Sequence, residues 1–258
     1  MNLKSLFNKR NYKYFYYSIK NYPSSVKDQK LNYNGFDNFE KLVEYFELNK
    51  FKSFAVIASG PSSKKIIYQK DVLYFCTNDS IELVKDYNYI YIVQDLFYLT
   101  KYLKSHNARN GWRGSMFFLE NIILNKKSYL KAKIYLSNKS RVKREFLISN
   151  FINNNNSINL YNDFLNKLKD VGINFESINS GFTCVQICFL FSVLTNKKMI
   201  IYGLDMGIGG DEYFDKKEKL GKSIKSNINR IKVGEILKSI YESDIEVYNM
   251  SNFMKNEI

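Results

Sequence analysis

The sequence predicts an α/β protein built on a doubly wound, mostly parallel β-sheet. Apolar runs of strand length recur along the chain, the segments between them are long enough for helices, and strands that alternate with helices pair in parallel. These runs lie at 54–58, 72–76, 89–94, 132–137, 198–205 and 245–251. With 258 residues, of which 45% are hydrophobic, the chain can bury one large core.

Four further segments have the character of helices. In 39–50, Phe39, Leu42, Val43 and Phe46 share one face at helical spacing, which predicts an outer helix. The other predicted helices are 162–172, 180–195 and 228–243. The helix at 180–195 is apolar on nearly all sides, so we expect it to be buried.

The order of these elements predicts one main domain with two additions. We expect residues 1–50 to form a basic, aromatic extension with its helix, and residues 51–258 to form the α/β domain. Between the two βα-type halves of that domain, the range 138–176 is polar and includes the run NNNN at 153–156. We expect this range to be a mobile, lid-like insertion.

The chain is strongly basic. It has 39 Lys and Arg against 25 Asp and Glu, a formal net charge of +14. Such a charge suits a polyanionic partner such as nucleic acid, an anionic membrane surface or a phosphate-rich substrate. The excess is mostly lysine and accompanies heavy use of Asn, Ile, Tyr and Phe, so biased coding is an equally simple cause.

Cysteine usage and hydropathy bear on cofactors and compartment. Cys76, Cys184 and Cys188 form no CxxC pair and have no histidine-rich neighbour, which favours buried thiols over a disulfide framework or a zinc site. No apolar run approaches the roughly 18 residues that a membrane span needs, and the first residues lack the pattern of a signal peptide. We therefore expect a cytoplasmic protein.

Ligands of such sheets bind beyond the carboxyl ends of the strands, so the residues that follow each strand are the candidates. After the first strand come Ser59, Gly60, Pro61 and Ser62. Gly60 allows a close backbone approach and Pro61 fits the first turn of a helix, so the loop is expected to present free N–H donors. Donors and serine hydroxyls at a helix start suit a phosphate or a ribose, although an ordinary capped turn has the same composition.

Three other strand ends carry polar residues. Asn179, Ser180 and Gly181 begin the apolar helix and, like the 59–62 loop, are small residues that can present N–H donors at a helix start. Asn78, within TNDS at 77–80, is either part of a helix cap or a ligand contact, and Asp95 places a carboxylate after the third strand.

The strand at 198–205 ends in a glycine-rich loop, YGLDMGIGGDEYFD at 202–215. The loop contains Gly203, Asp205 and Tyr213, and a structural turn is the simpler interpretation. Two common nucleotide motifs are absent, because GIGG lacks the strand, GxGxxG, helix order and KKEKLGKS has Lys216 where a P-loop needs its first glycine.

Taken in order, AVIASGPSS, INSGF and IIYGLDMGIGGDEYFD resemble the bacterial sialyltransferases of glycosyltransferase family 42. They are even more similar to the lipopolysaccharide-core Kdo transferases, which have a similar Ser-Gly-Pro turn, a Gly-Leu-Asp segment followed by a Tyr/Phe-Asp pair, and a closing strand like IEVYNMS. The resemblance spans roughly residues 54–251.

The resemblance implies a Rossmann-like, GT-A-like fold and an inverting glycosyltransferase that uses a CMP-activated 2-keto sugar. CMP-Kdo is the favoured donor and CMP-sialic acid the next. It implies that the Ser59–Ser62 loop, Asn78 and the Asn179–Gly181 helix start hold the nucleotide, that Gly203 and Asp205 line its pocket, and that Tyr213 donates its hydroxyl to the leaving phosphate. No metal or other cofactor is implied.

The catalytic base is the point of departure from the family. The sialyltransferases have a catalytic histidine in the stretch that matches roughly 219–230, and this chain has none there. Asp95 is our preferred base, the single histidine His106 is second, and Asp211 or Glu212 follow.

The implied acceptor is an anionic, membrane-borne glycan such as lipopolysaccharide, reached at the inner face of the cytoplasmic membrane. The basic, aromatic stretch at 8–22 then serves either as a membrane contact or as a helix packed on the core. Two other functions remain open. One is a non-enzymatic nucleic-acid or phosphate-binding module, and the other is a pyrophosphokinase-like enzyme on the same fold that needs ATP and a divalent metal.

Overall fold

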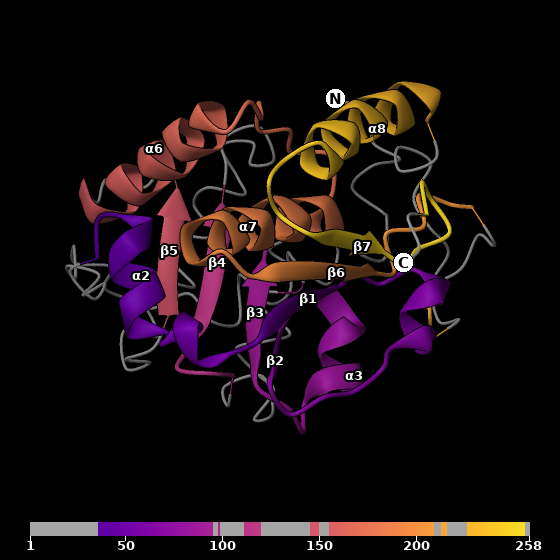
Figure 1. Cartoon of the computed structure of the whole chain (residues 1–258), viewed down its shortest axis with the longest axis horizontal. Helices are drawn as coiled ribbons and strands as arrows, with labels where there is room; N and C mark the ends of the chain where they lie inside the picture. The colour runs from indigo at the N-terminus through magenta and orange to yellow at the C-terminus, as the bar shows by residue number, and fades with distance from the viewer. Residues whose placement is uncertain are drawn as a thin grey trace, which may run out of the picture.

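The computed structural model describes residues 36–94, 98, 111–119, 145–149, 155–208, 213–215 and 226–255. Within these residues, seven strands form one sheet in the order β5-β4-β3-β2-β1-β6-β7, and every neighbouring pair is parallel (Figure 1). Helices flank the sheet. The predicted doubly wound α/β class is therefore confirmed.

The strands are short, and the three central ones, β1, β2 and β3, are buried from end to end. They are β1 (Ser53–Ile57), β2 (Val72–Thr77), β3 (Tyr89–Val93), β4 (Ser115–Leu119), β5 (Glu145–Ser149), β6 (Lys198–Tyr202) and β7 (Val247–Asn249). From β1 the chain winds outward to β5 and then returns to the other side of β1 as β6. The direction of winding thus reverses between β1 and β6, which makes their carboxyl ends the switch point of the sheet.

The helices of the described residues are of unequal length, and three of them exceed two turns. The elements are α2 (Phe39–Tyr45), η2 (Leu48–Lys50), η3 (Pro61–Lys65), η4 (Asn78–Ser80), α3 (Ile81–Val84), α6 (Asn155–Asp170), α7 (Ser180–Thr195) and α8 (Asn227–Tyr241), where η marks a 3₁₀-helix. Helices α2, α6, α7 and α8 lie on one side of the sheet and α3 on the other (Figure 1).

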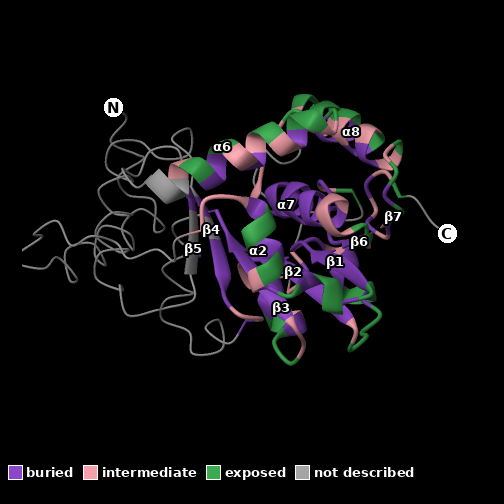
Figure 2. Ribbon diagram, turned by 60° about the vertical axis from the view of Figure 1, so that its left-hand side comes forward, coloured by how far each residue is buried: buried purple, intermediate pink, exposed green. Residues whose placement is uncertain are grey.

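Alternation along the strands divides the interior into two cores. On β1, Phe54 and Val56 belong to the larger core with α2, α6, α7 and α8, whereas Ala55 and Ile57 belong to the smaller core with α3. The central strands are buried on both faces, as Figure 2 shows in purple. Such strands are continuously apolar, which is why they could be recognised in the sequence.

Helix α7 crosses the middle of the sheet and is enclosed by it and by the outer helices. Twelve of its sixteen residues are buried. It ends at Asn196, whose left-handed conformation (φ 51°) stops the helix. Its apolar character reflects this central place. Among the residues that the structure covers, no helix is both long and apolar enough to cross a bilayer.

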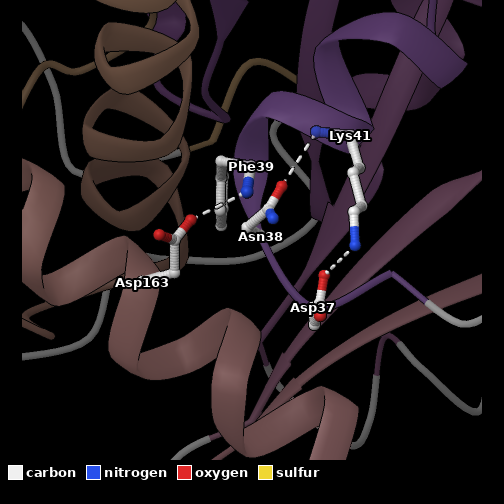
Figure 3. Close-up of polar contacts among 5 residues, drawn as sticks. All are labelled: Asp37, Asn38, Phe39, Lys41 and Asp163. Carbon is white, nitrogen blue, oxygen red and sulfur yellow. Dashed lines mark hydrogen bonds and ion pairs between the residues drawn. The ribbon is translucent and has the colours of Figure 1, made fainter.

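The outer helices α2 and α6 dock through a polar contact at the start of α2 (Figure 3). Asn38 caps the helix, since its Oδ1 accepts the amide of Lys41 at 3.0 Å. The amide of Phe39, one of the unpaired first-turn donors, is accepted by Asp163 Oδ2 of α6 at 2.8 Å. The Lys167 ammonium then bridges Glu40 of α2 and Asp163, at 2.7 and 3.0 Å.

Most predicted elements match observed ones, with shifts at their ends. Five of the predicted strands correspond to β1, β2, β3, β6 and β7, and the four predicted helices correspond to α2, α6, α7 and α8. The predicted strand at 132–137 lies outside the described residues. The predicted helix at 39–50 is interrupted, because α2 ends at Tyr45 and Glu47 adopts a left-handed conformation (φ 46°) before η2.

Strands β4 and β5 were not predicted. Part of the range expected as a lid, 138–176, supplies β5 at the sheet edge and α6 in the helical layer. The reason is visible in α6, where Phe164 and Leu168 are fully buried in the larger core. The helix is polar overall, but its apolar stripe packs against the sheet.

The three cysteines are buried and free, as the sequence predicted. Burial raises the pKa of the Cys76, Cys184 and Cys188 thiols above its ordinary value. They are therefore part of the core and not reactive groups.

Aromatic packing joins the outer helices to the sheet. The Phe39 ring lies 5.6 Å from that of Phe164 and 5.1 Å from that of Phe191, and the Phe164 ring lies 5.3 Å from that of Phe118 on β4. All four side chains have no exposed surface.

We predict that Phe164→Ala lowers the free energy of unfolding by about 3 to 5 kcal/mol, because it opens a cavity among these rings. Urea unfolding followed by circular dichroism measures the change. Ile228→Ala is the matched control, because Ile228 is 70% exposed and its loss should cost at most about 0.5 kcal/mol. Similar losses in both variants would contradict the packing described above.

Candidate functional site

The candidate site lies at the switch point, beyond the carboxyl ends of β1 and β6. Three segments distant in sequence meet there: the loop 58–63 after β1, the first turn of α7, and the loop 203–208 after β6. These are the segments that the sequence singled out, and the structure brings them together.

The loops after β1 and β6 continue the parallel pairing of their strands. The amide of Ala58 donates to Tyr202 O at 2.8 Å, and the amide of Gly60 donates to Gly203 O at 2.9 Å. A Cβ on Gly60 would overlap the Gly203 carbonyl and the Asp205 carboxylate, and one on Gly203, at φ +78°, would overlap the Ala58 carbonyl. Both positions therefore require glycine.

Asp205 connects the loops. Its side chain is only 1% exposed. Its Oδ2 accepts the amide of Ser62 at 2.8 Å, and its Oδ1 accepts the Ser62 hydroxyl at 2.6 Å and the amide of Asn252 at 2.7 Å. One carboxylate thus ties the β1 loop, the β6 loop and the segment after β7.

These bonds change the role expected for the 59–62 loop. The sequence predicted free N–H donors there, but the Gly60 and Ser62 amides have internal acceptors, and the Ser63 amide donates to Gly60 O at 3.1 Å. The expectation of free donors is wrong for these residues, because the Ser62 amide donates to the buried Asp205 carboxylate and the other two amides donate to backbone carbonyls. Pro61 is the first residue of η3, as predicted.

The start of α7 faces the same edge. Asn179 caps the helix, since its Oδ1 accepts the amide of Phe182 at 3.0 Å. A Cβ on Gly181 would lie 2.9 Å from the Ala58 Cβ, so the missing side chain lets the helix start against the end of β1. Within the described part of the chain, the amides of Ser180 and Gly181 have no hydrogen-bond acceptor. This helix start therefore keeps donors for a ligand.

A buried polar network fixes this helix start to the end of β3. The Thr183 hydroxyl donates to Gln94 Oε1 at 3.2 Å, and Gln94 Nε2 donates to Ser177 Oγ at 2.5 Å. Gln186 accepts the Glu176 amide through its own side chain at 3.0 Å. Sequence reasoning missed this network, because a single glutamine at the end of an apolar strand carries no pattern.

The TNDS segment after the second strand forms a capping box between Thr77 and Ser80, which confirms the predicted cap. Thr77 caps η4, and its backbone amide donates to Ser80 Oγ at 3.1 Å. Asn78 is half-buried in a left-handed conformation (φ 54°) at the first position of η4. The ligand contact of Asn78 stays a prediction.

A small pocket opens beside these loops. Its empty space is about 220 Å³ when the adjoining open solvent is included, and it is lined by Ser59, Asp79, Tyr98, Tyr213, Phe214 and Asp215. The Phe214 amide donates to Ser59 O at 3.0 Å and so holds the 213–215 segment against the β1 loop. Ligand pockets usually have about 300–1,000 Å³, so this one is a shallow hollow and not a complete nucleotide site.

Two of the predicted site residues, Ser59 and Tyr213, line this pocket, and Asp79 joins them from η4. Sequence reasoning treated Asp79 as part of a cap. Its position, three residues after the predicted strand at 72–76, was the signal that it lies at the carboxyl edge. The candidate bases Asp95, His106, Asp211 and Glu212 lie outside the described residues, and their roles stay predictions.

Among the described residues, no group of three or more His, Cys, Asp or Glu side chains is arranged to hold a metal ion. No family model, curated protein or solved structure matches this chain. The fold and the site define the class: a doubly wound α/β protein with a small pocket at the carboxyl edge of its sheet.

We predict that Asp205→Asn lowers the free energy of unfolding of the ligand-free protein by on the order of 3 kcal/mol. The amide nitrogen of asparagine cannot accept the hydrogen bonds that a carboxylate oxygen accepts at this place. Thermal unfolding at neutral pH measures the loss. Asp86→Asn, at an exposed position, is the matched control and should leave stability unchanged. Wild-type stability in Asp205→Asn would show that Asp205 does not hold the loops together.

Proposed function

We propose that this protein is an inverting glycosyltransferase that uses a CMP-activated 2-keto sugar. CMP-Kdo is the favoured donor, CMP-sialic acid the next, and the acceptor is lipopolysaccharide or another surface glycan. One observation carries the proposal: the segments that resemble such transferases, at 58–63, 179–182 and 203–206, meet at the switch point of the sheet.

The proposed donor site combines the first turn of α7 with the pocket. The Ser180 and Gly181 amides and the positive end of the α7 dipole suit the CMP phosphate. Ser59 and Tyr213 face it from the pocket. In this proposal Asp205, Gly60 and Gly203 hold the loops in place and do not contact the nucleotide, because their polar groups bond one another.

The chemistry needs two contributions from the protein. Breaking the bond between the sugar and CMP builds negative charge on the phosphate, which donors already in place stabilise. We assign Tyr213 and the α7 amides to this task. A base then takes the proton of the acceptor hydroxyl as the hydroxyl attacks the opposite face of the anomeric carbon, which inverts its configuration. Asp95 remains the preferred base, ahead of His106.

The proposal requires no metal or other cofactor. A pyrophosphokinase-like enzyme on the same fold would need ATP and a divalent cation. A basic nucleic-acid-binding module would need neither CMP nor ATP. The proposed site of action is the inner face of the cytoplasmic membrane, where a glycolipid acceptor is available.

Calorimetric titration with CMP in the presence of EDTA tests the proposal. We predict saturable binding of CMP, because amide and hydroxyl donors can hold its phosphate without a metal ion. ATP with Mg²⁺ is the comparison ligand and should bind more weakly than CMP. Absence of CMP binding, or binding of ATP only with the metal, would contradict a CMP-sugar site.

We predict that Tyr213→Phe slows hydrolysis or transfer of CMP-Kdo by about 10-fold or more, because the variant loses a hydroxyl that stabilises the leaving phosphate. CMP affinity should change little. Release of CMP, followed by chromatography, measures the rate. Tyr248→Phe on β7 is the matched control, since Tyr248 does not line the pocket. An unchanged rate in Tyr213→Phe would remove Tyr213 from the mechanism.

A further inference from the structure

The segment that joins η3 to β2 exposes apolar and basic side chains together. Ile67 is 65% exposed and Tyr68 is 42% exposed. Lys64, Lys65 and Lys70 beside them are also exposed. We call residues 64–70 the 64–70 surface. It lies on the side of the smaller core, where Ile66 is buried against Tyr202 and the tyrosines of β2 and β3.

The 64–70 surface is held in place from below. The Gln69 amide donates to the Tyr74 hydroxyl at 2.8 Å, and this hydroxyl donates to Gln69 O at 3.3 Å. The Tyr68 ring stacks on that of Tyr87, with centroids 4.8 Å apart and an interplanar angle of 14°. Ile67 and Tyr68 are therefore presented outward by a fixed backbone, which lowers the entropy cost of binding.

The charge of the surface is not compensated within the described residues. Lys64, Lys65 and Lys70 form no ion pair or hydrogen bond there, whereas nearby Lys52 pairs with Asp71 at 2.6 Å. Three lysines around an exposed isoleucine and tyrosine form a local positive field on a chain of net charge +14. Such a field attracts an anionic partner.

We propose that the 64–70 surface docks on an anionic lipid bilayer. Ile67 enters the boundary between headgroups and acyl chains, Tyr68 lies at headgroup depth, and the lysines contact the lipid phosphates. A bilayer fits better than nucleic acid. The more exposed of its two apolar side chains, Ile67, is aliphatic, and one face of the Tyr68 ring, on which a base would stack, is already covered by Tyr87.

The surface is connected directly to the candidate site. The short helix η3 contains both Ser62, which bonds to Asp205, and Lys64 and Lys65. From this edge the segment runs toward the start of β2, so docking would place the bilayer along the side of the sheet that carries the smaller core. The inference goes beyond the proposed function and does not depend on it, because it uses only the exposed side chains, their charges and the contacts below them.

Helix α8 offers a matched comparison. It also exposes two isoleucines, Ile228 at 70% and Ile231 at 60%. Their cationic neighbours are engaged, because Lys232 pairs with Glu176 at 2.8 Å and Arg230 Nε donates to Met206 O at 2.9 Å. The isoleucines of α8 are thus about as exposed as Ile67. Within the described residues, however, the lysines of the 64–70 surface are unpaired and the cations beside the α8 isoleucines are engaged.

Sedimentation of the full chain with vesicles tests the inference. One set of vesicles contains equal parts of phosphatidylcholine and phosphatidylglycerol, and the other contains phosphatidylcholine alone. We expect binding to the anionic vesicles, weakened by salt, and little binding to the neutral ones. Lys64→Gln with Lys65→Gln should weaken binding by roughly 10-fold or more, and Ile67→Ser by roughly 10-fold. Ile231→Ser, the matched control, should bind as the wild type does.

Several outcomes would overturn the inference. They are equal binding to both kinds of vesicle, no binding to either, loss of binding in Ile231→Ser equal to that in Ile67→Ser, or full binding by the lysine double variant. Binding of single-stranded DNA in place of anionic vesicles would also overturn it. Because all these positions are exposed, the variants should unfold at the wild-type temperature. CMP titration of the same variants separates this result from a failure of the proposed function.

Discussion

The close contact between the backbones that follow β1 and β6 is the constraint on which the site depends. Gly60 and Gly203 bond through amide and carbonyl, and neither position has room for a Cβ. This contact extends the parallel pairing beyond the sheet and brings Ser62 within reach of Asp205. Without two glycines at this point, the loops would separate and the carboxyl edge would have a different shape.

Burial of the Asp205 carboxylate follows from the same contact and determines which groups remain for a ligand. A buried carboxylate is stable only when donors surround it, and here two amides and one hydroxyl do so. The donors of the β1 loop are therefore used inside the protein. The first turn of α7, Ser59 and the pocket beside Tyr213 are the parts of this edge that can meet a substrate.

The short helix η3 connects the candidate site to the 64–70 surface. Its first residues are fixed to the β6 loop, and its last residues begin the exposed 64–70 surface. The proposed transferase activity would use a water-soluble donor and a lipid-borne acceptor, so it would need a nucleotide site close to a membrane contact. In this chain, rigid backbone joins the candidate site to the basic, apolar surface, so docking would also orient the site.

The sequence by itself determined the α/β class, most of the central strands and the extent of α7, because residues buried on all sides leave continuous apolar runs. It also located the Gly60, Gly181 and Gly203 segments, whose small residues mark close backbone approaches. Strands β4 and β5 were not found, since short apolar runs in a polar region resemble irregular segments. Only the tertiary structure decided that Asp205 faces inward and that Asp79 lines the pocket, because hydrogen-bond partners far apart in sequence leave no pattern along the chain.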